Sequence, residues 1–266
     1  MNTDTDNVSA APKIVSRDEW LRARVALLQR EKELTRSRDR LAQQRRELPW
    51  VRIDKSYAFD TPDGRRTLAD LFAGRSQLIV KHFMLAPGWA EGCVGCSYEV
   101  DHVEGALVHL ENQDVKVVAV SRAPLSEIAA FKRRMGWRID WVSSFGSDFN
   151  FDFHVSFTPE QVARGKAFYN YREDAVPSEE LSGFSVFARD SNGDVYHTYS
   201  AYGRGAEEVL STYMLLDLTP KGRNETDGGN LTDWVRHHDR YGAGGHVDST
   251  GRYVPPAAGP CCEAAS

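Results

Sequence analysis

The stretch SQLIVKHFMLAPGWAEGCVGCSYEVDH, residues 76–102, decides the fold. Its first half holds an apolar run, residues 78–85, that is typical of a central strand. A glycine-rich loop follows, and from Val100 onward apolar residues recur at helical spacing. Cys93 and Cys96 are therefore predicted to lie where a strand ends and a helix begins.

The flanking sequence predicts alternating strands and helices. Residues 115–121, VKVVAVS, are a β-branched run of the kind that is buried in a parallel sheet, and an amphipathic helix is expected over 124–137. Further strands are expected at 141–145, 184–190 and 195–202. This order predicts an α/β fold with a central sheet flanked by helices.

The two ends of the chain differ from this middle part. Residues 16–48 mix apolar side chains with dense Arg and Glu, which predicts a long helix or a helical hairpin, and Ser16 with Glu19 forms a capping-box signature. The last forty residues are rich in Gly, Pro, Asp and His. The expected organisation is a disordered N-terminus (1–15), a helical arm (16–48), the main domain (49–225) and an irregular C-terminal extension (226–266).

Composition narrows the function classes. The 266 residues are 41% hydrophobic and 27% charged, which is enough to build a core, and the net charge of -5 argues against a nucleic-acid partner. The chain has no apolar stretch of membrane-spanning length, and its polar first residues do not resemble a signal peptide. Only four cysteines occur, in two close pairs. We therefore expect a cytoplasmic protein without a membrane partner or a disulfide framework.

The pair Cys93 and Cys96 has the spacing at which two sulfurs can close a small disulfide ring across the first turn of a helix. Unpaired backbone N–H groups at that turn favour a thiolate over a thiol. Such a context lowers a cysteine pKa from about 8.5 to roughly 3.5–7.5. Cys93 is expected to attack a disulfide and Cys96 to resolve the product.

Two other interpretations of the pair remain open. A structural zinc site would need two more soft ligands, and two inert buried thiols are the other alternative. The strand, glycine, cysteine and helix order favours redox chemistry, so we expect neither a metal nor a cofactor. The distant zinc-ligand candidates would be Cys261, Cys262, His82, His102, His109, His237 and His238.

Five polar or aromatic residues are candidates for substrate binding: Trp89, Arg122, Arg134, Trp137 and His197. Arg122 and Arg134 would hold a thiolate or an anionic substrate, with a salt bridge to Asp148 or Asp152 as an equal alternative. His197 would donate a proton to a leaving thiolate, or else bond to a backbone carbonyl within its strand. The two tryptophans would shield the disulfide or simply pack in the core.

Longer segments carry a resemblance to a known family. They are HFMLAPGWAEGCVGCSYEVDH (82–102), VSRAPLSEIAAFKRRMGWRIDWVSSFGSDFNFDFHVSF (120–157), GFSVFARD (183–190), HTYSAYGRG (197–205) and LLDLTPKGRNE (215–225). Together they resemble domain of unknown function 899, a family of predicted dithiol-disulfide oxidoreductases. The resemblance, which runs from about residue 49 to 225, implies a thioredoxin-like fold and a dithiol reaction.

The sequence departs from ordinary thioredoxins in two ways. The Trp-Cys-Gly-Pro-Cys motif is absent, and Gly183 and Phe184 stand where a proline would face the dithiol. These departures favour a small-molecule or peroxide substrate more than an ordinary thioredoxin sequence would, although a protein disulfide stays possible. The prediction is a thiol-disulfide oxidoreductase that acts on a small-molecule or protein disulfide and is recharged by a thiol reductant.

Two alternatives from other classes stay open. One is a non-catalytic binding or assembly protein, in which the dithiol is inert and the helical arm forms a homodimer. The other is a peroxide reductase, because YAFDTPDGRRTLADLF (57–72) resembles the start of peroxiredoxin-like domains. The usual Pro-x-x-x-Thr/Ser-x-x-Cys motif of those domains is absent here.

Overall fold

The computed structural model describes residues 12–223, 225 and 234–256, and it separates into two compact units, Met1–Leu48 and Pro49–Ser266. The described part of the first unit is one continuous helix, α1 (Arg17–Arg46), rather than a hairpin. Ser16 caps it by accepting the N–H of Glu19 at 3.3 Å. Acidic residues in the first turn and basic residues in the last complement the helix dipole.

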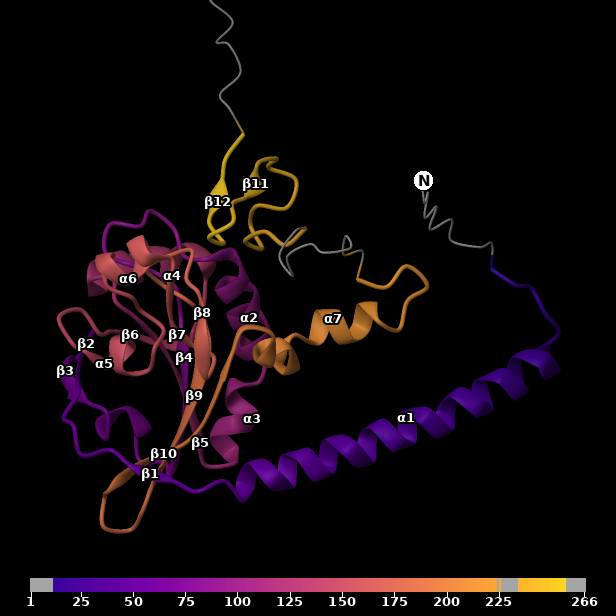
Figure 1. Ribbon diagram of the computed structural model, residues 1–266, viewed down its shortest axis with the longest axis horizontal. Helices are drawn as coiled ribbons and strands as arrows, with labels where there is room; N and C mark the ends of the chain where they lie inside the picture. The colour runs from indigo at the N-terminus through magenta and orange to yellow at the C-terminus, as the bar shows by residue number, and fades with distance from the viewer. Residues whose placement is uncertain (1–11, 224, 226–233, 257–266) are drawn as a thin grey trace, which may run out of the picture. The chain divides into compact units, whose positions relative to one another are not determined.

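The second unit is built on an eight-stranded mixed sheet in the order β1-β10-β9-β4-β5-β6-β2-β3 (Figure 1). Two small hairpins, β7–β8 and β11–β12, lie outside it. The strands are β1 (Val51–Arg52), β2 (Ala58–Thr61), β3 (Gly64–Thr67), β4 (Gln77–His82), β5 (Val115–Ser121), β6 (Asp140–Ser143), β7 (Lys166–Tyr169), β8 (Arg172–Ala175), β9 (Gly183–Arg189), β10 (Val195–Tyr202), β11 (His246–Val247) and β12 (Tyr253–Val254).

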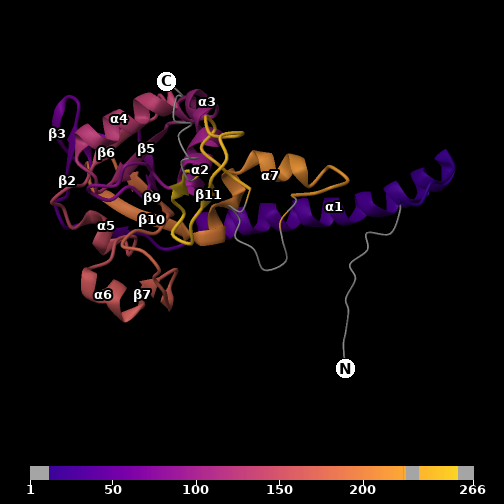
Figure 2. The same cartoon turned by 90° about the horizontal axis from the view of Figure 1, so that it is seen from above.

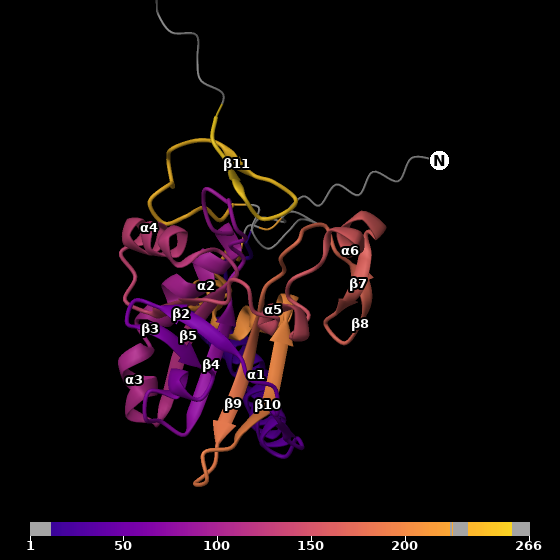
Figure 3. The same ribbon diagram turned by 90° about the vertical axis from the view of Figure 1, so that its left-hand side faces the viewer.

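Helices connect these strands. The helix α6 and the β7–β8 hairpin project together from one side of the sheet (Figures 2 and 3). The helices and 3₁₀ turns are η1 (Asp70–Phe72), α2 (Val94–Glu104), α3 (Leu107–Asn112), α4 (Leu125–Met135), α5 (Phe149–Asp152), α6 (Pro159–Arg164), η2 (Gly203–Val209) and α7 (Ser211–Leu216).

The strand β4 lies at the centre of the topology. It pairs in parallel with β5, which pairs in parallel with β6, and on its other edge it pairs antiparallel with β9. The antiparallel β9–β10 pair completes the core. The thioredoxin-like fold that the sequence predicts is confirmed by three features. Helical crossovers join the parallel strands, an antiparallel pair lies beyond β4, and the dithiol follows β4 directly.

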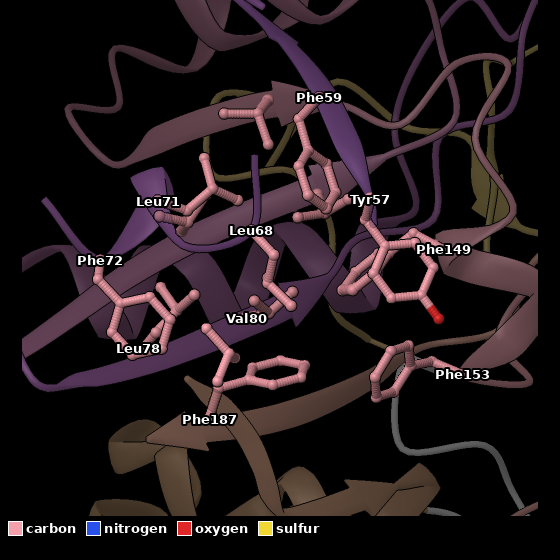
Figure 4. Close-up of a cluster of buried hydrophobic side chains, with 14 of the residues drawn as sticks. Tyr57, Phe59, Leu68, Leu71, Phe72, Leu78, Val80, Phe149, Phe153 and Phe187 are labelled. Atoms are coloured by element: carbon pink, nitrogen blue, oxygen red, sulfur yellow. The ribbon is translucent and has the colours of Figure 1, made fainter. Parts of the chain in front are cut away.

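The two faces of β4 bury different clusters, because successive side chains of a strand point to opposite sides of a sheet. Leu78 and Val80 face an aromatic cluster that includes Phe149, Phe153 and Phe187. The side chains labelled in Figure 4 point toward one another in this cluster. Its rings make edge contacts with centroid separations near 5 Å, such as 4.9 Å between Phe59 and Phe149.

The opposite face carries α2, α3 and α4. Phe83, Trp137 and Trp141 pack there with the apolar residues of α2 and α4, and both cysteines belong to the same cluster. Gly92 has no space for a side chain, because a Cβ at this position would lie 2.5 Å from the ring of Phe83. The loop before the dithiol is therefore pressed directly onto the core.

Some local predictions needed correction. The apolar run EEVLSTYMLLDL (207–218), whose pattern predicts one closing helix, is divided between the 3₁₀ turn η2 and the short α7. The helical run after the dithiol is broken between α2 and α3. The C-terminal extension contributes a packed segment, in which Val235 is fully buried against α2 and α7. Among the described residues, no helix is long and apolar enough to span a membrane.

Candidate functional site

The dithiol lies at the junction of β4 and α2, as the sequence predicts. Cys93 is the N-cap of α2 and Cys96 follows in its first turn. Both are free thiols, with exposed fractions of 5% and 1%. The backbone N–H of Met84 donates to the sulfur of Cys96 at 3.4 Å, and the N–H of Cys93 donates to the carbonyl of Met84 at 3.0 Å. The strand end thus fixes both cysteines.

A buried ion pair lies beside Cys96. Lys81 of β4 forms a salt bridge with Glu99 of α2, and its ammonium also donates to the hydroxyl of Ser182. Ser182 in turn donates to Glu99 at 3.4 Å. Although burial disfavours the ammonium, the charges of Cys96 and Glu99 keep the pKa of Lys81 above its ordinary value. A fixed positive charge is therefore available to the dithiol.

This charge reverses the expected order of the two thiol pKa values in the resting site. The hydrogen bond that Cys93 donates to Cys96, together with burial, raises the pKa of Cys93. Burial opposes a thiolate on Cys96 too, but that hydrogen bond and Lys81 lower the pKa of Cys96 to about 7. The expectation of a low pKa for Cys93 was wrong, because Lys81 stabilises the inner sulfur and Cys93 is shielded from solvent.

The shield over Cys93 comes from the C-terminal extension. The carbonyl of Gly251 accepts the N–H of Val94, the first residue of α2, at 2.8 Å. A Cβ on Gly251 would lie 3.0 Å from the sulfur of Cys93, and the residue has φ +84°. Only glycine fits this left-handed position against the sulfur. The β11–β12 hairpin lies beside the start of α2 in Figures 1 and 3.

Glu91 joins the dithiol loop to the same extension. Its carboxylate forms salt bridges with Arg134 of α4, at 2.8 Å, and with Arg240. Arg134 also binds Asp239 at 2.8 Å. Buried His237 contacts the carbonyl of Gly92 through Nε2 at 2.9 Å, and burial lowers its pKa. This polar cluster holds the loop before Cys93 against residues 237–240.

Arg122 and Trp89 belong to a second polar cluster. Arg122 forms salt bridges with Glu179, at 2.8 Å, and with buried Glu180. The indole N–H of Trp89 donates to Glu179 at 3.2 Å, and burial raises the pKa of Glu180 to about 7. Neither Arg122 nor Arg134 pairs with the aspartates that the sequence suggested. Those aspartates, Asp148 and Asp152, bind Lys55.

The last two candidates lie on different faces of the sheet. Trp137 packs in the cluster that contains the dithiol, and its indole N–H donates to Asp101 at 2.7 Å. His197 contacts the rings of Phe153 and Phe187, which line the opposite face. Its Nε2 bonds to Ser200 at 2.7 Å. The structure therefore brings Trp89, Arg134 and Trp137 to the dithiol side, whereas His197 lies on the other.

Within residues 12–223, 225 and 234–256, no three His, Cys, Asp or Glu side chains are grouped to hold a metal ion. His102 bonds to Thr212 at 2.7 Å, and His82 to Ser185 at 2.8 Å. Cys261 and Cys262 lie outside the described residues.

Comparison with known proteins adds the family. Residues 9–241 match the family described as a bacterial protein of unknown function, DUF899. The chain belongs to this family. No curated protein matches its sequence.

Solved structures resemble this DUF899 protein at low identity. Peroxidoxin BcpB from Mycobacterium tuberculosis is 15% identical, with a TM-score of 0.40 over 62% of this chain and 94% of that one. Peroxiredoxin Q from Xanthomonas campestris is 15% identical, with a TM-score of 0.39 over 58% and 87%. A putative protein disulfide isomerase from Bacteroides thetaiotaomicron is 17% identical, with a TM-score of 0.37 over 62% and 90%.

Sequence reasoning missed Lys81, Glu99, Ser182 and Gly251. A signal for the first two was present, because a lysine inside the apolar run 78–85 and a glutamate three residues after Cys96 both fall on positions that should be buried. A buried charge needs a partner, so the two could have been paired. Ser182 and Gly251 had no comparable signal, since they come from distant segments.

Proposed function

We propose that this DUF899 protein is a thiol-disulfide oxidoreductase in which Cys93 and Cys96 cycle between a dithiol and a disulfide. The observation that carries the proposal is the buried Lys81–Glu99 pair beside two hydrogen-bonded thiols at a helix N-terminus. An inert pair of buried cysteines needs no buried ion pair, which costs desolvation energy. The Lys81 ammonium would instead stabilise a thiolate on Cys96, which a dithiol reaction requires.

The reaction starts from the reduced pair. Cys93 transfers its proton to the thiolate of Cys96 along their hydrogen bond and attacks one sulfur of the substrate disulfide. The substrate S–S bond breaks, and the other sulfur leaves as a thiolate. A mixed disulfide now joins Cys93 to the other half of the substrate. Cys96 loses its proton and attacks the sulfur of Cys93, so the second half leaves as a thiolate. One substrate disulfide is reduced to two thiols, and the protein gains the Cys93–Cys96 disulfide.

Lys81 and Glu99 support the second step. The Lys81 ammonium stabilises negative charge on Cys96, and Glu99, the carboxylate whose charge acts on the same thiol, takes its proton in the proposed step. Ser182, which bonds to both, holds their geometry. A thiol reductant then attacks the disulfide and restores the dithiol. Small-molecule and protein disulfides are both substrates of the proposed class.

A single-turnover experiment tests the proposal. The reduced protein, with Cys261 and Cys262 replaced by Ser, is mixed with a small aromatic disulfide, and thiol release and protein mass are followed. We expect two thiols released per chain and an intramolecular Cys93–Cys96 disulfide. Cys96→Ser should release one thiol and trap a mixed disulfide on Cys93, whereas Cys93→Ser should slow release at least about 1,000-fold.

A non-catalytic assembly protein is the second candidate, and the 5% exposed fraction of Cys93 is the observation that favours it. In that case, the folded protein would release no thiol in the single-turnover experiment. Both cysteines would react only at the rate of global unfolding. Equal slow release from the wild type and from Cys93→Ser would therefore replace the oxidoreductase proposal with this one.

A further inference from the structure

The segment Asp248–Arg252 joins β11 to β12 and forms a self-contained turn. The carboxylate Oδ1 of Asp248 accepts the N–H of Thr250 at 2.8 Å and the N–H of Arg252 at 3.1 Å. Backbone bonds join Gly251 to Asp248, at 3.0 Å, and Asp248 to Arg252, at 2.9 Å. One side chain thus organises the whole turn.

The turn occupies the place that a substrate needs. Its Gly251 lies against the sulfur of Cys93, and its carbonyl takes the N–H of Val94, which is the first free donor of α2. At a helix N-terminus, that donor would otherwise face a thiolate or an incoming acceptor. A disulfide cannot reach Cys93 while the turn stays in this position.

The contacts that hold the turn against the start of α2 are of a kind that breaks easily. Its hairpin consists of two strands of two residues, and isolated short hairpins are marginally stable. Arg252 stacks over the ring of Trp89 at 5.1 Å, and Arg240 over Tyr253 at 4.9 Å, both near solvent. A cavity of about 500 Å³ separates the dithiol loop, at Trp89 and Glu91, from the turn. Val247 and Tyr253 of the hairpin pack against the apolar cluster at the start of α2, but both are only partly buried. Partial burial of this kind holds a segment less firmly than full burial in the core.

We propose that the Asp248–Arg252 turn is a displaceable cover that occupies the substrate position at Cys93. Thiol reactivity then requires the turn to leave the start of α2. Opening exposes Cys93 and frees the N–H of Val94, while Cys96 stays beside Lys81. The role of the cover in controlling turnover rests on the proposed function, whereas its control of access to Cys93 does not.

The test compares two aspartates that build the same turn. Asp190, between β9 and β10, accepts the N–H groups of Asn192 and Asp194 at 2.9 Å each, with the same spacing as Asp248. It lies at the opposite end of the sheet, because β9 runs antiparallel to β4. Asp248→Ala should open the cover, and Asp190→Ala is its matched control.

The measurement is the alkylation rate of Cys93 in the full chain, read by peptide mass spectrometry, with iodoacetamide and with a bulky polyethylene-glycol maleimide. Asp248→Ala should accelerate the reaction with the bulky reagent at least about tenfold, because opening relieves a steric barrier. The acceleration with iodoacetamide, which is smaller, should be less. A change in thiol pKa alone would instead raise both rates by the same factor. Asp190→Ala should stay within about twofold of the wild type for both reagents.

Equal alkylation rates of Cys93 in the wild type and in Asp248→Ala would overturn the proposal that the turn covers Cys93. So would the same acceleration in Asp190→Ala, since the effect would then reflect general destabilisation. The oxidoreductase proposal is judged separately, by thiol release in a single turnover. Faster alkylation in Asp248→Ala without thiol release would uphold the cover and reject the oxidoreductase.

Discussion

Two neighbouring residues of β4 show that a buried basic side chain keeps its charge on one face of the sheet and loses it on the other. Lys81 and His82 each have an exposed fraction of 1%. Lys81 faces α2 and keeps its charge, because Glu99 and Cys96 compensate it. His82 faces the aromatic cluster, and burial followed by repulsion from Lys81 lowers its pKa to about 3.

The difference lies in the partners that each face supplies. His82 bonds to Ser185 at 2.8 Å, Ser185 to Ser200 at 2.8 Å, and Ser200 to His197 at 2.7 Å, all without a carboxylate. The α2 face instead places a carboxylate and a thiol against its base. Burial alone neutralises a group, whereas burial with a compensating charge stores that charge. The α2 face can therefore stabilise a thiolate, whereas the residues of the aromatic face pack against one another.

The largest effect is expected from removing the charge of Lys81. Lys81→Met leaves Glu99 buried without its partner, which should lower the free energy of unfolding by about 3–5 kcal/mol. The pKa of Cys96 should rise, because the cation that stabilises its thiolate is lost. Urea unfolding measures the first effect, and the ultraviolet absorbance of the thiolate against pH measures the second.

A double variant separates folding from chemistry. Lys81→Met with Glu99→Leu should recover most of the lost stability, since no unpaired charge stays buried. The pKa of Cys96 should rise less than in Lys81→Met, because Glu99, which raises it, is removed as well. If Lys81→Met alone titrates like the wild type, Lys81 does not tune the dithiol and the comparison of the two faces fails.

The second effect concerns pH and the aromatic face. Between about pH 3 and 6.5 the unfolded chain protonates His82 and the folded chain does not, so stability falls as pH decreases through this window. His82 should account for about 2 kcal/mol of the loss between pH 7 and 5. His82→Asn should reduce that loss by this amount in urea unfolding. An unchanged pH dependence would show that His82 takes up its proton in the folded chain at the same pH as in the unfolded chain.

The smallest effect is expected at His197. The variant His197→Gln should change the single-turnover rate less than about twofold, because His197 is bonded to Ser200 on the face away from the dithiol. Unfolding free energy should fall by about 1 kcal/mol through the altered hydrogen bond. A tenfold slower turnover with normal folding would restore His197 as the proton donor that the sequence suggested.

The sequence predicted the parts of this molecule that depend on local patterns. The runs that form β5 and β10 have the bounds expected of them, and the dithiol lies at the predicted junction, because periodicity and β-branched content are local signals. Contacts between distant segments left no such signal. Glu179 and Glu180 meet Arg122 through a loop, and Gly251 meets Cys93 through the tail. The contact of Gly251 is the one that covers Cys93.

We propose above that Cys93 and Cys96 form a reversible redox pair. The most direct measurement equilibrates the Cys261→Ser/Cys262→Ser protein in glutathione buffers of graded potential and follows the dithiol by mass. We expect a single two-electron transition to an intramolecular Cys93–Cys96 disulfide that added reductant reverses. Two free thiols across the whole range, or glutathione adducts without an internal disulfide, would contradict it.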